Sequence, residues 1–426
     1  MNVIDIKGCV WVLILFLMSC ACKKQEMETG IQTDAQGVTI ALPALWKSSV
    51  SKDGTLAYGV TTSVVHNGNV LCSGGEKGGK PLGNQSLVMK DSETGKDLWK
   101  WDDKLTTFEA LYVSTPYQHE KYLVFQGGPR GYCLDLSDVR TVFQNTQGNQ
   151  MRDVVKGFQD IFFLTGNVPE SEQGQFEFDH WIFQGSFKSN IYIPIIRPPY
   201  SRKFVRRIPA GNVVGEASAP HPFVQGNDTL IAFAYWEPAT VEKDDYFLGL
   251  FNLSKKKWVY DRKSIPGAWR TPYATGGNIV FESVGSVFCY RISDGETVWR
   301  NTSFQQNTGF DDLIIAENKL IGNNSDTYLY ALDLETGKTL WKEKSNGSTS
   351  QLVYMDGVVY YVGGMVLHAV EVATGKHLWR LKSPDVAVNQ GAFFFGFVAA
   401  VPGKNGKKGH IIANTGLNVY CYEAAR

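Results

Sequence analysis

The sequence lacks any imbalance of charge. Its 426 residues contain 42 Lys and Arg and 42 Asp and Glu, which gives a formal net charge of +0. A neutral chain has no general electrostatic attraction for nucleic acid or for an anionic membrane surface. Histidine is also scarce, at seven residues, and no two are spaced as metal ligands. We therefore expect no nucleic-acid partner, no metal site and no catalytic residues.

Long apolar runs are missing as well. The run from Val10 to Met18 is too short to cross a bilayer, which takes about 20 residues. It ends in Leu17-Met18-Ser19-Cys20, which resembles a bacterial lipobox, where signal peptidase cuts before a cysteine that then carries lipid. The alternative is an ordinary secretory signal with Cys20 as a bystander.

The residues after Cys20 are polar and poor in bulky apolar side chains, as expected of a tether. We predict a signal peptide over residues 1–19, a lipidated Cys20 within a flexible tether over residues 20–38, and a folded body over residues 39–426. The protein would then be anchored by lipid in the bacterial cell envelope, at the outer membrane. The sequence does not indicate the leaflet or the oligomeric state.

The sequence shows no helical periodicity after the tether. It shows a repeated segment instead. Aromatic residues end five similar segments, DSETGKDLW, DLSDVRTVF, RISDGETVW, DLETGKTLW and EVATGKHLW, at Trp99, Phe143, Trp299, Trp341 and Trp379. Trp258 ends a shortened copy, and Trp46 stands in ALWK, a copy without the turn. Successive intervals along Trp258, Trp299, Trp341 and Trp379 are 41, 42 and 38 residues. This period is typical of β-propeller blades.

One complete copy predicts four short strands with glycine turns between them: TSQLVYM, VVYYVGG, VLHAVEV and HLWRLK. Such a sheet cannot bury both faces alone, so the sheets must stack around an axis. The aromatic residue of each outer strand would cover apolar surface beside it.

The two ends of the chain complement each other. The C-terminal VYCYEAAR lacks a turn and an outer strand, and residues 44–47 are an outer strand without a turn. Pairing them would close the ring and hide the sheet edges. The 115 residues between Phe143 and Trp258 leave room for two blades. We predict an all-β fold, a single propeller of eight four-stranded blades, with seven as the alternative.

Within that gap, the strands of one blade are irregular. We expect SNIYIPII and YSRKFVRRIPA to be its inner and outer strands, and DTLIAFAYW, YFLGLFNL and KKWVYDR to form the next blade.

The unit LYALDLETGKTLW resembles the pyrroloquinoline-quinone-like (PQQ-like, quinoprotein-like) propeller repeat. Quinoprotein dehydrogenases and the BamB-type lipoproteins of outer-membrane β-barrel assembly share this repeat. The resemblance covers about residues 40–426 and implies the fold. It does not decide the function, because the repeated residues are those that hold blades together.

For a quinone enzyme, the resemblance implies two adjacent cysteines beside the quinone and oxygen ligands for calcium. The sequence has no adjacent cysteine pair, and Asp91, Asp244-Asp245 and Asp311-Asp312 fall on different blades. A PQQ-dependent dehydrogenase is therefore disfavoured, and we expect no cofactor. Cys133, Cys289 and Cys421 align with Ala331, so we expect them to be buried, far apart and unpaired. Cys72 has no evident partner.

Departures from the repeat are the candidate binding features. Residues 166–189 insert an acidic and then aromatic segment into the third blade, and residues 197–207 are rich in arginine. Decorated loops and a charged strand edge are the alternative interpretations. Candidate binding residues are Trp181, Tyr200, Arg202, Lys203, Arg206, Arg207, Trp236 and Trp269.

These features favour a non-catalytic envelope lipoprotein that acts as a protein-interaction scaffold. By resemblance, it would be BamB-like, with barrel-assembly proteins as partners. The alternative is a carbohydrate-binding surface or periplasmic lipoprotein whose glycan site uses the aromatic third and fourth blades.

Overall fold

The computed structural model describes residues 32–50 without 36, 62–75, 85–101, 117–127, 130–145, 152–167, 177–208, 211–267, 271–283, 285–305, 308–347 and 350–426. The signal peptide, Cys20 and Trp269 lie outside these ranges. β-strands dominate the described residues, and a single 3-10 helix, η1 (Pro384–Ala387), accompanies them. None of the described helices is long and apolar enough to cross a membrane.

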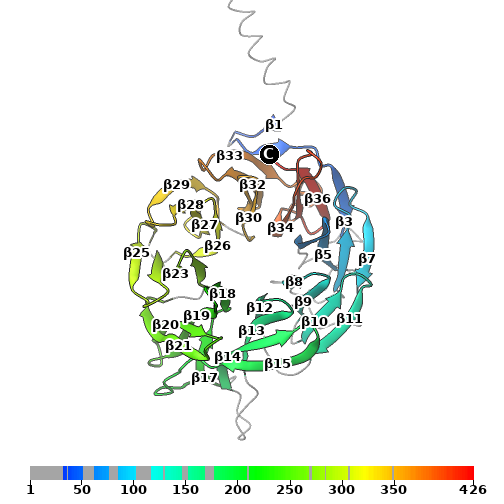
Figure 1. Ribbon diagram of the computed structural model, residues 1–426. Helices are drawn as coiled ribbons and strands as arrows, with labels where there is room; N and C mark the ends of the chain where they lie inside the picture. Colours follow the sequence, from blue (N-terminus) through cyan, green and yellow to red (C-terminus); the bar gives the residue numbers. More distant parts are fainter. Residues whose placement is uncertain are drawn as a thin grey trace, which may run out of the picture.

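The repeating unit is a four-stranded antiparallel sheet, as the sequence predicts. In the copy that the sequence outlines best, β30 (Val353–Met355), β31 (Val358–Gly363), β32 (Val366–Glu371) and β33 (His377–Lys382) pair in chain order. Such units are arranged around a common axis in Figure 1. The fold is therefore all-β and propeller-like.

Four more sheets repeat this order exclusively from consecutive strands. They are β4 (Thr62–His66), β5 (Asn69–Gly75), β6 (Gln85–Lys90) and β7 (Asp97–Trp101); β8 (Tyr117–His119), β9 (Tyr122–Gly127), β10 (Arg130–Asp135) and β11 (Arg140–Asn145); β22 (Tyr273–Thr275), β23 (Asn278–Ser283), β24 (Ser286–Arg291) and β25 (Thr297–Asn301); and β26 (Phe310–Ala316), β27 (Lys319–Asn324), β28 (Tyr328–Asp333) and β29 (Thr339–Lys344).

A ten-stranded sheet joins two further units. The first unit is β12 (Arg152–Lys156), β13 (Ile161–Asn167), β14 (Glu177–Ser186) and β15 (Ser189–Ile196), and the second is β18 (His221–Gln225), β19 (Asp228–Pro238), β20 (Asp244–Asn252) and β21 (Lys257–Ile265). Strand β17 (Gly211–Ala217) lies between them, parallel to β14 and antiparallel to β19, and β16 (Arg206–Ile208) pairs with β17. The strands of the second unit lie where the sequence predicts them.

The sequence prediction for the first of these units was wrong in three places. SNIYIPII forms the outer strand β15, not an inner strand, because it pairs only with β14. YSRKFVRRIPA is not the outer strand, because only Arg206–Ile208 is extended and it pairs with β17. Much of the predicted insertion, residues 177–186, is the central strand β14.

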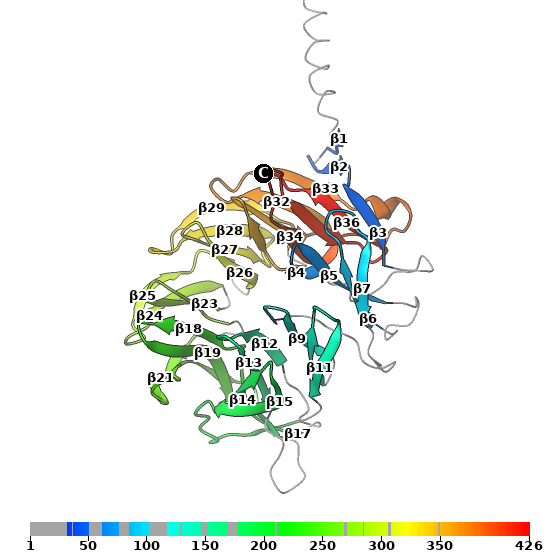
Figure 2. The same cartoon turned by 45° about the vertical axis from the view of Figure 1, so that its right-hand side comes forward.

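The predicted pairing of the chain ends is present. β3 (Trp46–Ser49) pairs with β36 (Asn418–Glu423), so that Trp46 faces Cys421 and Lys47 faces Tyr420. The sheet is completed by β35 (His410–Asn414) and β34 (Phe395–Val401), and Figure 2 shows β3 beside β36. Dividing the ten-stranded sheet at β17 gives eight four-stranded units. We keep the eight-bladed closed ring as a prediction.

The ordered body extends further toward the N-terminus than the expected boundary at residue 39. β1 (Gln32–Thr33) pairs with β2 (Thr39–Ala41), and β2 adds to β33 through Thr39 and Leu381. Nζ of Lys382 lies 2.7 Å from a carboxylate oxygen of Asp34. The end of the predicted tether therefore lies against the folded body.

Three outer-strand tryptophans dock on the turn of the following unit. Trp46, Trp299 and Trp341 lie against Gly95, Gly337 and Gly375, where an added Cβ would be 2.4, 2.3 and 2.7 Å from a ring atom. Their Nε1 atoms donate to the carbonyl oxygens of Ser92, Leu334 and Val372 at 2.8, 3.2 and 3.0 Å. These glycines have φ of 69° to 76°, so the turn needs glycine for its backbone and for the docked ring.

The other repeat aromatics also pack between strands. Trp258 contacts the rings of Phe233 and Phe251, and Trp379 contacts Tyr360. Phe143 packs, partly buried, against the cluster around Cys133. Trp99 is described with the candidate site.

The cysteine predictions are confirmed. Cys133, Cys289 and Cys421 lie opposite Phe143, Trp299 and Trp46 across the strand pair, and all are buried free thiols, as is Cys72. Burial raises the pKa of each thiol to about 12. Cys133, Cys289 and Cys421 are small core residues opposite an aromatic residue. Ala331 occupies the same position opposite Trp341.

Candidate functional site

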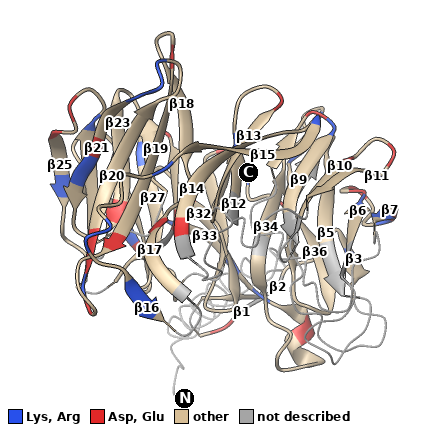
Figure 3. Ribbon diagram, turned by 90° about the horizontal axis from the view of Figure 1, so that it is seen from below, with Lys and Arg blue, Asp and Glu red and all other residues tan. Residues whose placement is uncertain are grey.

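The arginine-rich segment connects the third and fourth units, and buried carboxylates hold it in place. Arg197 and Arg202 both reach Asp179 on β14, at 2.9 and 2.7 Å. Arg206 pairs with Asp244 at the start of β20 and lies 5.9 Å from the ring centre of Trp236. Figure 3 shows the basic strand β16 in blue near its partner β17.

A second anchor lies under the same segment. Glu237, 4% exposed, accepts from Arg262 at 2.6 Å and from the backbone N–H of Ser201 at 2.5 Å. Burial opposes ionisation of Glu237, but the hydrogen bonds from Arg262 and Ser201 outweigh it and lower the pKa of this carboxyl. The backbone at Ser201 is therefore fixed by a charged pair inside the fold.

The predicted binding residues divide into core and surface. Tyr200 and Trp236 are only 6% and 7% exposed, and the Tyr200 hydroxyl donates to the carbonyl of His180 at 3.1 Å. Both are core residues of this junction, where β17 pairs with β14 and with β19, and neither offers a free ring face. Trp181 is half-buried beneath the Arg197 guanidinium. Arg202, Lys203 and Arg207 are exposed, whereas Arg206 is half-buried.

A different feature stands out at the junction between the β4–β7 and β8–β11 units. The turn that should receive Trp99 reads S-D-V-R, so Val139 occupies the position of the docking glycine. Val139 keeps the left-handed backbone, with φ of 61°, which is unfavourable for a β-branched residue. In the three glycine turns an added Cβ would lie within 2.7 Å of the docked ring, so a valine here is incompatible with that docking. Val139 and Trp99 both pack, partly buried, against the apolar cluster of this junction. Within the described residues, the Trp99 indole has no hydrogen bond like those of the docked tryptophans.

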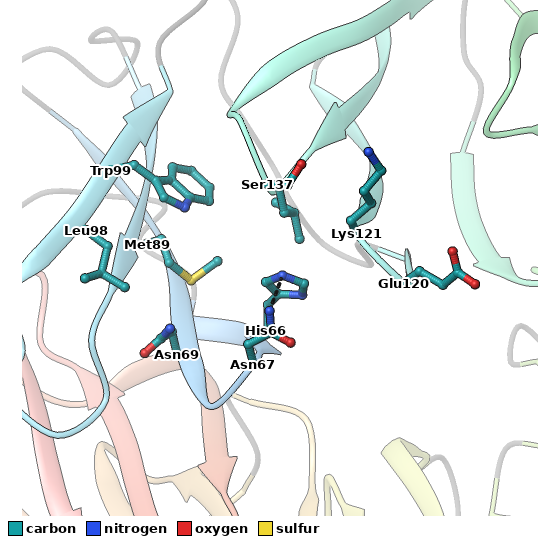
Figure 4. A pocket seen from close by; sticks show the side chains of 10 residues that line it. His66, Asn67, Asn69, Met89, Leu98, Trp99, Glu120, Lys121 and Ser137 are labelled. Carbon is teal, nitrogen blue, oxygen red and sulfur yellow. Dashed lines mark hydrogen bonds between the residues drawn. The ribbon is translucent and has the colours of Figure 1, made fainter.

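A cavity of about 480 Å³ lies at this junction. Met89, Leu98, Trp99 and Leu136 supply its apolar lining, and His66, Asn67, Asn69 and Ser137 supply polar groups, with Glu120 and Lys121 at its edge. Figure 4 shows Trp99, Met89 and His66 turned toward the same space. The cavity therefore combines an indole with neutral hydrogen-bonding side chains.

The charges around this cavity are largely neutralised. Nζ of Lys121 lies 2.6 Å from Asp135. Burial opposes ionisation of Asp135, yet hydrogen bonds from Lys121 and Ser137 bring its pKa down to about 2. Burial lowers the pKa of His66, so its ring is uncharged near neutral pH. The Asn69 side chain has no hydrogen-bond partner among the described residues. The lining therefore presents an indole and neutral polar groups beside one ion pair.

The described part of the chain contains no cluster of three or more His, Cys, Asp or Glu side chains that could hold a metal ion. The sequence reasoning did not identify the cavity at the first junction. A signal was present, because DLSDVRTVF is the full-length copy of the turn segment without glycine.

Comparisons with known proteins agree with the fold. Residues 247–424 match the sequence profile of the family described as "Outer membrane protein assembly factor BamB", which confirms the resemblance to the PQQ-like repeat over that segment. Comparison with curated protein sequences gave no match.

Solved structures with similar folds include Sqt1 of Chaetomium thermophilum bound to the N-terminus of ribosomal protein L10. It has 11% identity and a TM-score of 0.58, over 89% of this chain and 100% of Sqt1. A europium-containing methanol dehydrogenase has 11% identity and a TM-score of 0.56, over 87% of this chain and 84% of its own. BamB of Moraxella catarrhalis has 11% identity and a TM-score of 0.49, over 90% and 100%. The likeness to the first two supports the propeller fold.

Proposed function

We propose that this protein is a non-catalytic, lipid-anchored scaffold of the bacterial envelope that binds other envelope proteins, as in BamB-like assembly of outer-membrane β-barrels. The observation that carries the proposal is the match of residues 247–424 to the family described as an outer membrane protein assembly factor. A rigid ring of stacked sheets suits this role, because its connecting segments can present a fixed surface to partners.

The arginine-rich connection between the third and fourth units is the proposed partner-binding surface. Asp179, Glu237 and Asp244 fix its backbone and its inner arginines, and this leaves Lys203 and Arg207 exposed. Exposed apolar side chains accompany them, with Ile208 38% and Val241 70% exposed. Preorganised cations beside apolar groups favour a partner segment that carries acidic and apolar residues.

A pull-down of the native lipoprotein tests both the function and the surface. We expect barrel-assembly proteins to be recovered with the wild type and to be lost with the double variant K203E/R207E. The control K257E/K376E changes the net charge equally at two other exposed lysines and should keep the partners. Recovery of glycan-uptake proteins instead, or equal recovery with both variants, would contradict the proposal.

The anchor is tested separately. We expect Cys20→Ala to abolish incorporation of a radiolabelled fatty acid, because the lipobox cysteine supplies the acylated thiol. The variant should either be released as a soluble ring or keep its uncut signal peptide. Label that persists on the variant would place the anchor elsewhere.

A further inference from the structure

We propose that the cavity between the β4–β7 and β8–β11 units is a binding site for a neutral saccharide. This activity is independent of the partner-binding surface, which lies on the third and fourth units. The cavity of about 480 Å³ falls in the size range of small-molecule pockets.

The two kinds of lining match the two kinds of surface on a sugar ring. A pyranose has an apolar face of C–H groups and an edge of hydroxyl groups. Trp99, Met89 and Leu98 supply the apolar lining, and the half-exposed indole is the flat group on which a C–H face stacks. Side chains of Asn69 and Ser137 line the same cavity. The Asn69 amide can donate to and accept from hydroxyl groups, and the Ser137 hydroxyl, which donates to Asp135, can still accept.

The electrostatics favour an uncharged ligand. Lys121 is paired with Asp135, and the ring of His66 is neutral because burial lowers its pKa. Glu120 lies at the edge, and Figure 4 shows its carboxylate directed away from Trp99. An ionic ligand would therefore meet no unpaired opposite charge beside the indole. Asn69, whose amide has no partner among the residues that the structure describes, would gain hydrogen bonds from a hydroxyl-bearing ligand.

The cavity arises from one departure from the repeat. The docked tryptophans at three other junctions each cover a glycine and bond its turn. At this junction Val139 takes the glycine position in a left-handed conformation, and Trp99 lines an open cavity instead. Backbone strain retained beside a pocket is the pattern expected where binding requires it.

Saturation-transfer NMR on the full-length lipoprotein in lauryldimethylamine-oxide micelles, a detergent without a sugar headgroup, tests the proposal. The probes are neutral disaccharides of glucose, galactose, mannose and N-acetylglucosamine. We expect saturable transfer to ring C–H protons of at least one probe. Asn69→Ala should weaken its binding roughly tenfold, the loss of about one good hydrogen bond. Asn190→Ala, at an exposed asparagine of the third unit, should leave it unchanged.

Val139→Gly gives a second test that does not remove a lining group. We expect it to abolish saturable transfer, because glycine frees the space in which Trp99 can dock, while the variant stays as stable as the wild type or becomes more stable. The absence of saturable transfer from every probe to the wild type would overturn the proposal. So would binding that neither Asn69→Ala nor Val139→Gly alters. Partner recovery with Asn69→Ala should match the wild type, so the two functions can fail separately.

Discussion

At the scale of single residues, Trp341 illustrates how one side chain joins two units. Its ring lies on Gly375, and its Nε1 donates to the carbonyl of Val372 at 3.0 Å, both in the following unit. Removing the ring leaves a cavity at the junction and an unpaired carbonyl. We expect Trp341→Ala to lower the free energy of unfolding by about 3 to 5 kcal/mol in chemical denaturation.

Leu340 is the matched control for that substitution. It precedes Trp341 on the same strand but is 50% exposed, so Leu340→Ala should change the free energy of unfolding by less than about 0.5 kcal/mol. Equal losses for the two variants would contradict the docking role of Trp341.

His368 makes stability depend on pH. It is fully buried, with Nε2 2.9 Å from the carbonyl of Gly363 and Nδ1 3.0 Å from Nε2 of His377. Burial lowers its pKa to about 3, and the neighbouring His377 and Arg380 act in the same direction. Because the folded protein holds His368 neutral while the unfolded chain binds a proton near pH 6.5, its contribution is complete above about pH 6.5 and declines as the pH falls toward 3.

The expected slope is about 1.4 kcal/mol of unfolding free energy per pH unit within that window. His368→Gln keeps a donor and an acceptor but cannot be protonated, so its stability should fall less steeply with acid than that of the wild type. His119→Gln, at a half-buried position of β8, serves as the control for the same exchange. A wild-type slope retained in His368→Gln between about pH 7 and pH 5 would contradict this account.

The structural role of the repeat aromatics could be predicted from the sequence, but the burial of aromatic residues outside the repeat could not. The aromatic residues of the outer strands were predicted because they recur with a constant period. The burial of Tyr200 and Trp236 could not be predicted from their positions in the sequence, because it depends on the pairing of β14 and β19 with β17. No local pattern encodes that contact between strands from two units.

At the scale of elements, β3 supplies the outer strand that the C-terminal sheet lacks. Its four residues pair with residues 418–421 of β36, so the two partners come from opposite ends of the sequence. Deleting residues 39–50 would expose the backbone N–H and C=O groups of β36, and an open edge pairs with other molecules. We expect the deleted protein to aggregate or to unfold at lower urea concentration, as measured by size-exclusion chromatography and urea titration.

Deletion of residues 32–38 is the control, because it removes β1 and leaves β3 in place. Terminal residues with few contacts are usually dispensable, so this variant should remain monomeric with a similar urea midpoint. A 39–50 deletion that behaves in the same way would indicate that β3 does not protect the edge.

Elements with a complete repeat were predictable, because T-G-K turns and alternating residues fix both strand type and register. The strands of residues 189–208 were not predictable. β15 reads as an apolar run, and β16 pairs with β17, a strand that belongs to neither of the two four-stranded units. Pro194 and two exposed isoleucines, Ile191 and Ile193, place β15 at an edge. A strand with this pattern could equally have been an inner strand by sequence alone.

At the scale of the whole molecule, the N-terminal strands β1 to β3 and the C-terminal sheet lie in the same part of the molecule (Figures 1 and 2). The fold class was predictable because every unit repeats the same contacts. The cavity at the first junction was not, because it follows from the loss of one contact. Both proposed binding surfaces occur where the repeat is broken, which separates the residues that bind from those that hold the units together.

The eight-bladed closed ring is the central claim, since it fixes the position of every proposed surface. Ser49 and Asn418 are directly opposed across the β3–β36 pair, where side chains are close enough for a disulfide. Oxidation of S49C/N418C in the full-length protein, followed by peptide mass spectrometry, should give an intramolecular link between the two ends of the chain. The pair Y328C/K344C, opposed in the same way within one unit, is the positive control. If the control pair links while the terminal pair stays reduced, or links only between different molecules, the ring is not closed by β3.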